Sequence, residues 1–319
     1  MLTFLALLTL AGAITVRVVA AGNERAAEAA YPPEGQFTQV SGVPVHYVQR
    51  GDGPDLVLLH GAGGSTRDFT FNFVDRLTDR YRVTVFDRPG LGYSGRPEKY
   101  GIWSRDAESP REQARFLQAA ADEIGVTDPI VLGHSFGGAV AMAWALERPD
   151  DTAAVVMVAG VANEWEGGLG WFYNVNASPA GGALFVPAAT AFVPQSYIDN
   201  TVEGIFRPHS APEKYAEHIG PRMSARRETA RANARQVHAL KPHIIAMVPG
   251  YGDLPMPIEI IHGDADDIVP LDVHAIPLSG QAPGAALTVL KGVGHMPQHT
   301  NAADVEAAID RAATRAGLR

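Results

Sequence analysis

The sequence predicts an α/β fold, with a mostly parallel central sheet and helices on both of its faces. From about residue 37 onward, short β-like runs alternate with helical stretches, which is the pattern of such a sheet. Most of these runs are continuously apolar, as expected for strands that are buried on both sides. With 319 residues and 46% hydrophobic content, the chain can bury one large core, with or without an insertion.

The first two strands flank Ser41-Gly42 and should form an antiparallel hairpin. The capping pattern Ser109-Pro110-Arg111-Glu112 predicts a helix that runs to about Gly125. The predicted strands are 37–40, 45–49, 56–59, 83–86, 130–132, 153–158, 258–261 and 287–290.

Residues 161–254 interrupt the alternation, because they contain no convincing buried strand and are rich in aromatic, glycine, proline and arginine residues. Since they lie between two predicted strands, we expect a largely helical lid over the carboxyl ends of the sheet, inserted before the last two strands. The core would then comprise residues 36–160 and 255–319. The aromatic residues of the lid either line an apolar pocket or, as we expect for most of them, form the lid's own core. They are Trp165, Trp171, Phe172, Tyr173, Phe185, Phe192, Tyr197 and Phe206.

The lid also carries a basic stretch, in which residues 213–241 contain seven Lys and Arg against three Glu. The five arginines recur at roughly helical spacing, and a solvated helical face is the simplest interpretation. Contact with anionic lipid headgroups, or recognition of an acidic substrate, are the sharper hypotheses. The arginines are Arg222, Arg226, Arg227, Arg231 and Arg235.

The N-terminus is a separate segment, because residues 2–22 are almost wholly apolar and nearly long enough to cross a bilayer. A membrane anchor is the favoured interpretation, and an exported protein with a cleaved signal peptide or a buried helix are the alternatives. Arg17 and Arg25 on the C-terminal flank favour a cytoplasmic body, whereas export requires the opposite orientation. Residues 23–35, which end in Pro32-Pro33 and Gly35, are predicted to be a linker.

Composition excludes some classes of function. The net charge of −9 argues against a nucleic-acid partner, because phosphate binding needs a basic face. The chain has no cysteine, which removes disulfides, thiolate metal sites and cysteine nucleophiles. We expect no cofactor and no metal, and the oligomeric state stays open.

A candidate nucleophile lies in the motif Gly-His-Ser-Phe-Gly at residues 133–137. The motif follows a predicted buried strand and opens into a predicted helix, so Ser135 would lie on a tight strand-to-helix turn. The backbone N–H of the next residue, Phe136, would then point at a developing oxyanion. Alone, such a short motif is equally consistent with a plain glycine-rich turn.

A second glycine-rich loop, residues 60–64, follows the predicted strand 56–59. Its backbone N–H groups can face a bound oxygen, and we expect the N–H of Ala62 to pair with that of Phe136 in an oxyanion hole. A phosphate-binding loop is the alternative, but Ser65-Thr66-Arg67 does not continue that motif.

Two late segments supply the residues that would activate a serine. Asp264, Asp266 and Asp267 follow the strand 258–261, and His295 follows the last strand. A histidine can act as the general base, and a carboxylate on its other nitrogen fixes the tautomer. Taken singly, the aspartates also fit a turn, a helix cap or a cation site, and a lone histidine is usually structural.

These segments together resemble the α/β-hydrolase fold superfamily, from about residue 37 to the C-terminus. The matching motifs lie at residues 60–64, 87–94, 133–137, 263–266 and 294–295. The resemblance implies that Ser135 is the nucleophile, His295 the base and Asp266 the acid, with Asp264 as the second choice. Residues 87–90 would brace the oxyanion loop.

A serine at this position implies acyl-enzyme chemistry, whereas the dehalogenases and epoxide hydrolases of the fold use an aspartate. The leading hypothesis is therefore a serine hydrolase acting on a moderately apolar carboxylic ester. A C–C bond hydrolase or a perhydrolase of the haloperoxidase type with the same triad is the alternative. A noncatalytic ligand-binding protein of this fold is the hypothesis from another class.

Overall fold

The computed structural model describes residues 1–97, 100, 106–168 and 170–319, and within them the strands form one mixed sheet in the order β1-β2-β4-β3-β5-β6-β7-β8. The pairs β1/β2 and β2/β4 are antiparallel, and all later pairs are parallel. The strands are β1 (Gln36–Val40), β2 (Val43–Arg50), β3 (Asp55–Leu59), β4 (Arg82–Phe86), β5 (Ile130–His134), β6 (Ala154–Val158), β7 (Ile258–Gly263) and β8 (Ala285–Leu290). The predicted class and the initial hairpin are confirmed.

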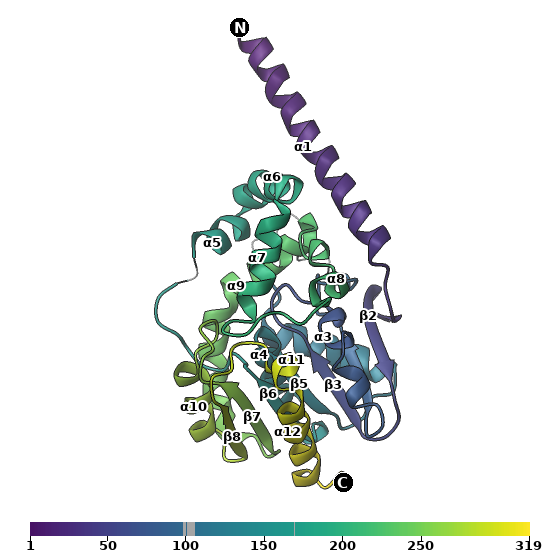
Figure 1. The fold of residues 1–319 in the computed structure, drawn as a ribbon, viewed down its shortest axis with the longest axis vertical. Coiled ribbons are helices and arrows are strands. Elements are labelled where there is room, and N and C mark those ends of the chain that lie inside the picture. The colour runs from purple at the N-terminus through teal and green to yellow at the C-terminus, as the bar shows by residue number, and fades with distance from the viewer. Residues whose placement is uncertain (98–99, 101–105, 169) are drawn as a thin grey trace.

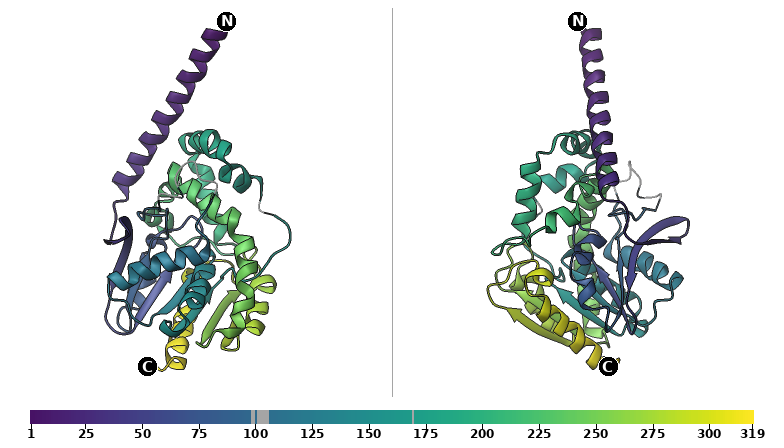
Figure 2. Two further views of the ribbon diagram at one scale, coloured as in Figure 1. Left: turned by 180° about the vertical axis from the view of Figure 1, so that it is seen from behind. Right: turned by 45° about the vertical axis from the view of Figure 1, so that its right-hand side comes forward.

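Helices cover both faces of the sheet (Figures 1 and 2). Successive residues of a strand point to opposite sides, so Val131 joins the core under one set of helices while Ile130 and Leu132 join the other. One core lies under α3 (Pro110–Glu123), α4 (Phe136–Glu147) and α10 (Leu271–Gln281). The other lies under α2 (Thr66–Thr70), η1 (Val74–Arg76) and α12 (Ala302–Arg315). The capping box at Ser109 begins α3 as predicted.

One strand departs from the expectation of burial on both faces. Strands β3, β5, β6 and β7 are buried along their whole length, but β8 has only one fully buried residue, Leu290. The reason is its position, because β8 is one of the two edge strands of the sheet and has a neighbour on one side only.

The N-terminal helix α1 (Leu2–Ala30) is longer than the sequence predicts. The expected linker at residues 23–35 is helical up to Ala30, since Asn23 and Glu24 bond to the segment between β6 and β7. Residues 3–15 are exposed, and Figure 1 shows this part projecting away from the body. Helix α1 is long and apolar enough to cross a membrane, and a signal sequence would have the same character.

The segment between β6 and β7, hereafter the β6–β7 segment, is largely helical in the part that the structure describes, and it precedes the last two strands. Figure 1 shows its shorter helices gathered beyond one end of the sheet, on the side of the body that α1 leaves. The helices are α5 (Trp171–Ala177), η4 (Gly181–Phe185), α6 (Val186–Phe192), α7 (Gln195–Ile205), α8 (Tyr215–Ile219), η5 (Pro221–Met223), α9 (Arg227–Met247) and η6 (Val248–Asp253).

Candidate active site

Ser135 lies at the turn between β5 and α4 with a strained backbone. Its φ of 55° and ψ of −121° fall in a region that L residues rarely adopt. The turn is held by backbone hydrogen bonds, because the N–H of Ser135 donates to Val158 O and its own carbonyl accepts from Gly138 and Val161. Strain that the surroundings maintain in this way is typical of functional sites.

The glycines of the motif are required by close packing. A Cβ on Gly133 would lie 2.2 Å from the carbonyl oxygen of Gly137, and one on Gly137 would lie 2.1 Å from that of Leu59. The strand and the helix can therefore meet this closely only without side chains at these two positions. The sequence pattern alone indicated the turn, and the geometry gives its physical reason.

His295 and Asp266 are in direct contact. His295 Nδ1 lies 2.8 Å from Asp266 Oδ2, so the ring carries a proton on Nδ1 and donates it to the carboxylate. Asp264 instead accepts from the N–H of Gly292. Of the two candidate acids, Asp266 is thus the one that meets the histidine.

The Asp266 carboxylate is fully surrounded by donors. Its Oδ1 accepts from the N–H groups of Ile268 and Val269, and His262 also faces Oδ2 at 3.3 Å. Burial opposes ionisation, but the hydrogen bonds from His262 and His295 outweigh it and hold the pKa of Asp266 well below its usual range. The group is therefore an anion at neutral pH and would stabilise an imidazolium at His295.

The loop of His295 is joined to the serine turn through His134. The Nε2 of His134 donates to the carbonyl oxygen of His295 at 2.8 Å, and the two rings lie 4.9 Å apart. Burial and the neighbouring His295 lower the pKa of His134 to about 4, so His134 is neutral. In the described part of the chain no hydrogen bond joins Ser135 to His295, and such bonds are commonly long in ligand-free enzymes.

The loop after β3 is held by hydrogen bonds from Arg88, which lies outside the loop in the sequence but is buried beside it. The buried guanidinium donates to the carbonyl oxygens of His60 and Gly61, at 2.9 Å each, and lies 4.3 Å from the centre of the Phe136 ring. Arg88 thus contacts the loop that contains Ala62 and also the residue that follows Ser135. Burial lowers the pKa of Arg88 to about 9, which still leaves it charged at neutral pH.

The β6–β7 segment holds the next peptide of the same loop. The N–H of Gly63 donates to Asn233 Oδ1 at 2.7 Å, and Ser224 Oγ donates to Gly63 O at 2.5 Å. Among the described residues the N–H of Ala62 has no hydrogen-bond partner. The N–H of Phe136, at the first position of α4, is one of the donors that every helix start leaves unpaired.

The predicted brace at residues 87–90 is confirmed. Asp87 accepts from the N–H groups of Thr66 and Tyr93 and from His46 Nδ1, at 2.7 to 2.8 Å. Burial raises the pKa of this carboxyl, but the His46 contact and the backbone donor outweigh it and keep the net shift downward. A buried anion therefore fixes the start of α2, close to the loop of Ala62.

A second buried carboxylate, Asp68, was not anticipated from the sequence. Its oxygens meet His299 Nε2 at 2.9 Å and Tyr215 OH at 2.7 Å. His299 follows His295 in the chain by four residues, and Tyr215 belongs to α8. Asp68 consequently links the loop of the candidate base to the β6–β7 segment. No cluster of three or more potential metal ligands occurs among the described residues.

The arginines do not form the solvated face that the sequence suggested. Arg226 and Arg227 pair with Glu28 and Glu24 of α1. Arg231 and Arg235 are buried, at 4% and 1% exposed, and none of the three Arg231 side-chain nitrogens has a hydrogen-bond partner in the described structure. The prediction that most of the aromatic residues form the lid's own core is also wrong for four of them. The exposed residues are Trp171, Phe172, Phe192 and Tyr197.

The alpha/beta hydrolase fold family matches residues 54–302, and the chain belongs to this family. An alpha/beta hydrolase fold protein from Burkholderia ambifaria superposes with a TM-score of 0.70 at 22% identity, covering 87% of this chain and 97% of that one. That likeness shows the shared fold.

Two curated relatives differ in the activities their names give. The chain is 28% identical over 270 residues to a 2-hydroxy-6-oxononadienedioate/2-hydroxy-6-oxononatrienedioate hydrolase of Klebsiella pneumoniae, covering 81% of this chain and 86% of that protein. It is 38% identical over 142 residues to the dihydrolipoyllysine-residue acetyltransferase component of the acetoin cleaving system of Cupriavidus necator, which covers 44% of this chain. That match spans only 34% of the length of the acetyltransferase component.

Proposed function

We propose that this protein is a serine hydrolase that cleaves carboxylic esters through an acyl-enzyme. The observation that carries the proposal is the contact between His295 Nδ1 and Asp266 Oδ2, combined with the strained turn at Ser135 in a chain of the alpha/beta hydrolase fold family. The contact leaves Nε2 of His295 free to accept a proton, which is what a general base requires.

The proposed reaction has two halves. His295 Nε2 takes the proton of Ser135 Oγ as the oxygen attacks the ester carbonyl, and the oxyanion is held by the N–H groups of Ala62 and Phe136. The imidazolium, stabilised by Asp266, returns the proton to the departing alkoxide, which leaves as the alcohol. Water then repeats the steps on the acyl-serine and releases the acid.

A second candidate rests on the Klebsiella relative, which aligns over most of both chains. The substrate in the name of that relative is a dicarboxylate, and Arg231, which has no hydrogen-bond partner among the described residues, is a group that could receive a carboxylate. We therefore keep C–C bond hydrolysis of an acidic ketone as the alternative reaction of the same three residues.

The β6–β7 segment is proposed to act as the lid of this site. Residues 161–254 would close over a core made of residues 36–160 and 255–319, and the contacts of Asn233 and Ser224 with Gly63 support this arrangement. We further propose that residues 2–22 anchor the protein in a membrane, because α1 is long and apolar and projects from the body. Export after cleavage of a signal peptide is the alternative, and carbonate extraction of cell membranes distinguishes the two.

The proposal is tested with a fluorophosphonate probe, which labels activated serines. We expect the full chain to be labelled, Ser135→Ala to lose the label, and Ser279→Ala, a change on the exposed side of α10, to keep it. Labelling that survives Ser135→Ala would overturn the assignment, and complete absence of labelling would favour a noncatalytic protein. Turnover of a p-nitrophenyl ester series, compared with that of an acidic ketone, decides between ester and C–C cleavage.

A further inference from the structure

Large apolar side chains are exposed along the outer side of the β6–β7 segment. Five of them, which we call the apolar rim, are more than 40% exposed: Trp171, Phe172, Leu184, Phe192 and Tyr197. The Trp171 ring lies 6.1 Å from Phe172 and 5.9 Å from Phe185, so α5 and η4 present their apolar groups together. A concentration of exposed apolar groups on one segment of a folded protein commonly marks an interaction site.

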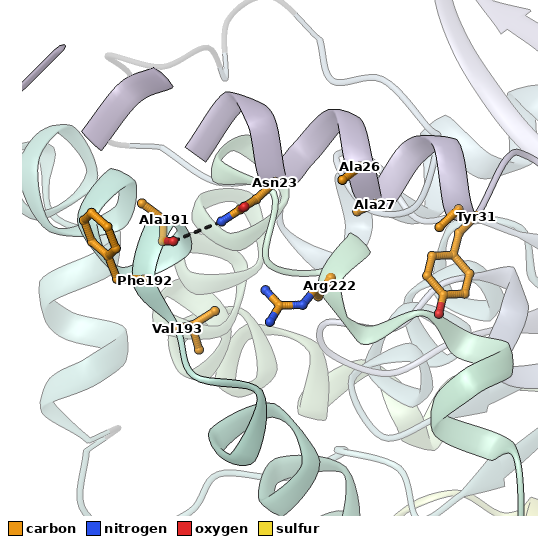
Figure 3. Close-up of a pocket in the computed structure, with 9 residues that line it drawn as sticks. Asn23, Ala26, Ala27, Tyr31, Ala191, Phe192, Val193 and Arg222 are labelled. Carbon is orange, nitrogen blue, oxygen red and sulfur yellow. Dashed lines mark hydrogen bonds between the residues drawn. The ribbon is translucent and has the colours of Figure 1, made fainter. Parts of the chain in front are cut away.

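The α6 end of the apolar rim, at Phe192, lies where α1 meets the body. Asn23 donates to the carbonyl oxygen of Ala191 at 3.0 Å, and Glu24 pairs with Arg227 at 2.7 Å, which holds α1 against α6 and the start of α9. Figures 1 and 2 show α6 at the end of the body nearest the free part of α1. Between α1 and α6 lies a pocket of about 490 Å³ lined by Ala26, Ala27, Phe192, Val193 and Arg222, among others (Figure 3).

The length of α1 determines how close the rim comes to a bilayer. At about 1.5 Å per residue, residues 2–22 extend over about 31 Å, close to the ~30 Å of a hydrocarbon core. Only residues 2–15, about 21 Å, precede the part of α1 that packs on the body. Placing the whole apolar run in the bilayer therefore brings the remaining ~10 Å, together with α6 beside it, into the lipid interface.

Two of the arginines next to α1 are already paired. Arg226 and Arg227 are neutralised by Glu28 and Glu24, so they are not available for anionic headgroups. Aromatic and aliphatic side chains that border a membrane-spanning helix fit the boundary between headgroups and acyl chains.

We propose that the apolar rim inserts into the interface of the bilayer in which α1 is anchored, so that the β6–β7 segment binds the lipid surface directly. The proposal rests on the membrane-anchor assignment and is independent of the reaction at Ser135. In place of headgroup contacts by Arg226 and Arg227, it assigns an apolar contact to α5, η4, α6 and the start of α7.

Trp171 provides the test. The full chain is reconstituted in phosphatidylcholine vesicles whose acyl chains are either brominated, which quenches nearby tryptophan, or unmodified. We expect brominated lipid to quench part of the tryptophan emission, and we expect this quenching to disappear in Trp171→Phe. Trp165→Phe should retain the quenching, because Trp165 packs against His274 within the body. Equal quenching in Trp171→Phe and the parent chain would overturn the proposal.

Sedimentation of the same vesicles separates this inference from the anchor. If the chain sediments with the vesicles but Trp171 is not quenched, the membrane-anchor assignment stands and the proposal that the apolar rim inserts is refuted. A chain that does not sediment refutes both. A second variant, Leu184→Ser combined with Phe192→Ser, should still sediment through α1 while the quenching of Trp171 falls at least two-fold, and unchanged quenching would count against the rim. Fluorophosphonate labelling of the same samples reports the proposed function separately.

Discussion

Asn233 Oδ1 accepts a hydrogen bond from the N–H of Gly63 at 2.7 Å, across 170 residues of sequence. The contact joins α9 of the β6–β7 segment to the loop that follows β3. Together with the bonds of Arg88 to His60 and Gly61, it occupies the backbone groups on both sides of Ala62. The N–H of Ala62 is thereby left available, in a loop that is held from two directions.

Asn233→Ala should slow the reaction more than it weakens substrate binding. In the proposed scheme Asn233 positions the loop without touching the reacting atoms, so we expect kcat to fall roughly tenfold. Loss of an oxyanion donor itself lowers kcat more, by about 100-fold or more. Steady-state kinetics on a p-nitrophenyl ester measures kcat and KM. Asn200→Ala, an exposed position on α7, is the matched control, and equal kinetics in both variants would contradict the positioning role.

Substitution of Asp266 should lower kcat far more than substitution of the neighbouring Asp264. Asp266→Asn removes the carboxylate that orients His295, so kcat should fall by about ten-thousand-fold, as expected for the acid of a triad. Asp264→Asn, whose side chain accepts from Gly292 near the surface, should stay within about two-fold. Comparable losses in the two variants, measured by initial rates, would mean that the acid has been assigned to the wrong residue.

Stability should fall as the pH drops below neutrality. Burial, with help from nearby positive groups, lowers the pKa values of His60, His134 and His274 to about 4, whereas an unfolded histidine titrates near ~6.5. Between these values the unfolded chain binds protons that the folded chain does not. The free energy of unfolding should therefore be highest above pH ~6.5 and decline toward pH ~4, by up to about 1.4 kcal/mol per pH unit for each histidine.

Urea denaturation at several pH values checks this slope, and His274→Gln isolates one contribution. The glutamine can still accept from the N–H of Asn163, as His274 Nδ1 does, but it does not titrate. We expect a shallower decline in this variant. A slope identical to that of the parent chain would show that His274 does not titrate in this way.

Arg231→Met should stabilise the ligand-free protein. A buried guanidinium without hydrogen-bond partners costs free energy, and methionine fills similar space without a charge, so we expect a gain of about 1–3 kcal/mol in the free energy of unfolding. Thermal shift with a small dicarboxylate tests the ligand role of Arg231, since the parent chain should be stabilised and the variant should not. If Arg231→Met is less stable and the dicarboxylate acts equally on both, the group has another partner.

The sequence could predict the residues that lie directly after strands. Ser135, Asp266 and His295 follow β5, β7 and β8, and local apolar runs locate those strands, so the order and spacing of the motifs were sufficient. The edge position of β8 could not be foreseen in the same way, because an apolar run does not reveal how many neighbours a strand has.

Hydrogen bonds between residues far apart in the chain could not be predicted from the sequence, for a different reason. Nothing near Asn233 or Ser224 indicates that they bond to Gly63, and nothing near Glu24 indicates a partner 203 residues away. These contacts depend on how the β6–β7 segment lies against the body. The helical conformation of residues 23–30, within the predicted linker 23–35, was missed for the same reason, because the pairing of Glu24 with Arg227 favours continuation of α1.

The most direct test of the account is to trap the acyl-enzyme. The full chain is mixed with p-nitrophenyl acetate, quenched in acid within the first turnover, digested and analysed by mass spectrometry. The account predicts one acetyl group on the peptide that contains Ser135, formed with a burst of one p-nitrophenolate per chain, and absent from Ser135→Ala and His295→Ala. An acetyl group on another residue, or an undiminished burst in Ser135→Ala, would contradict it.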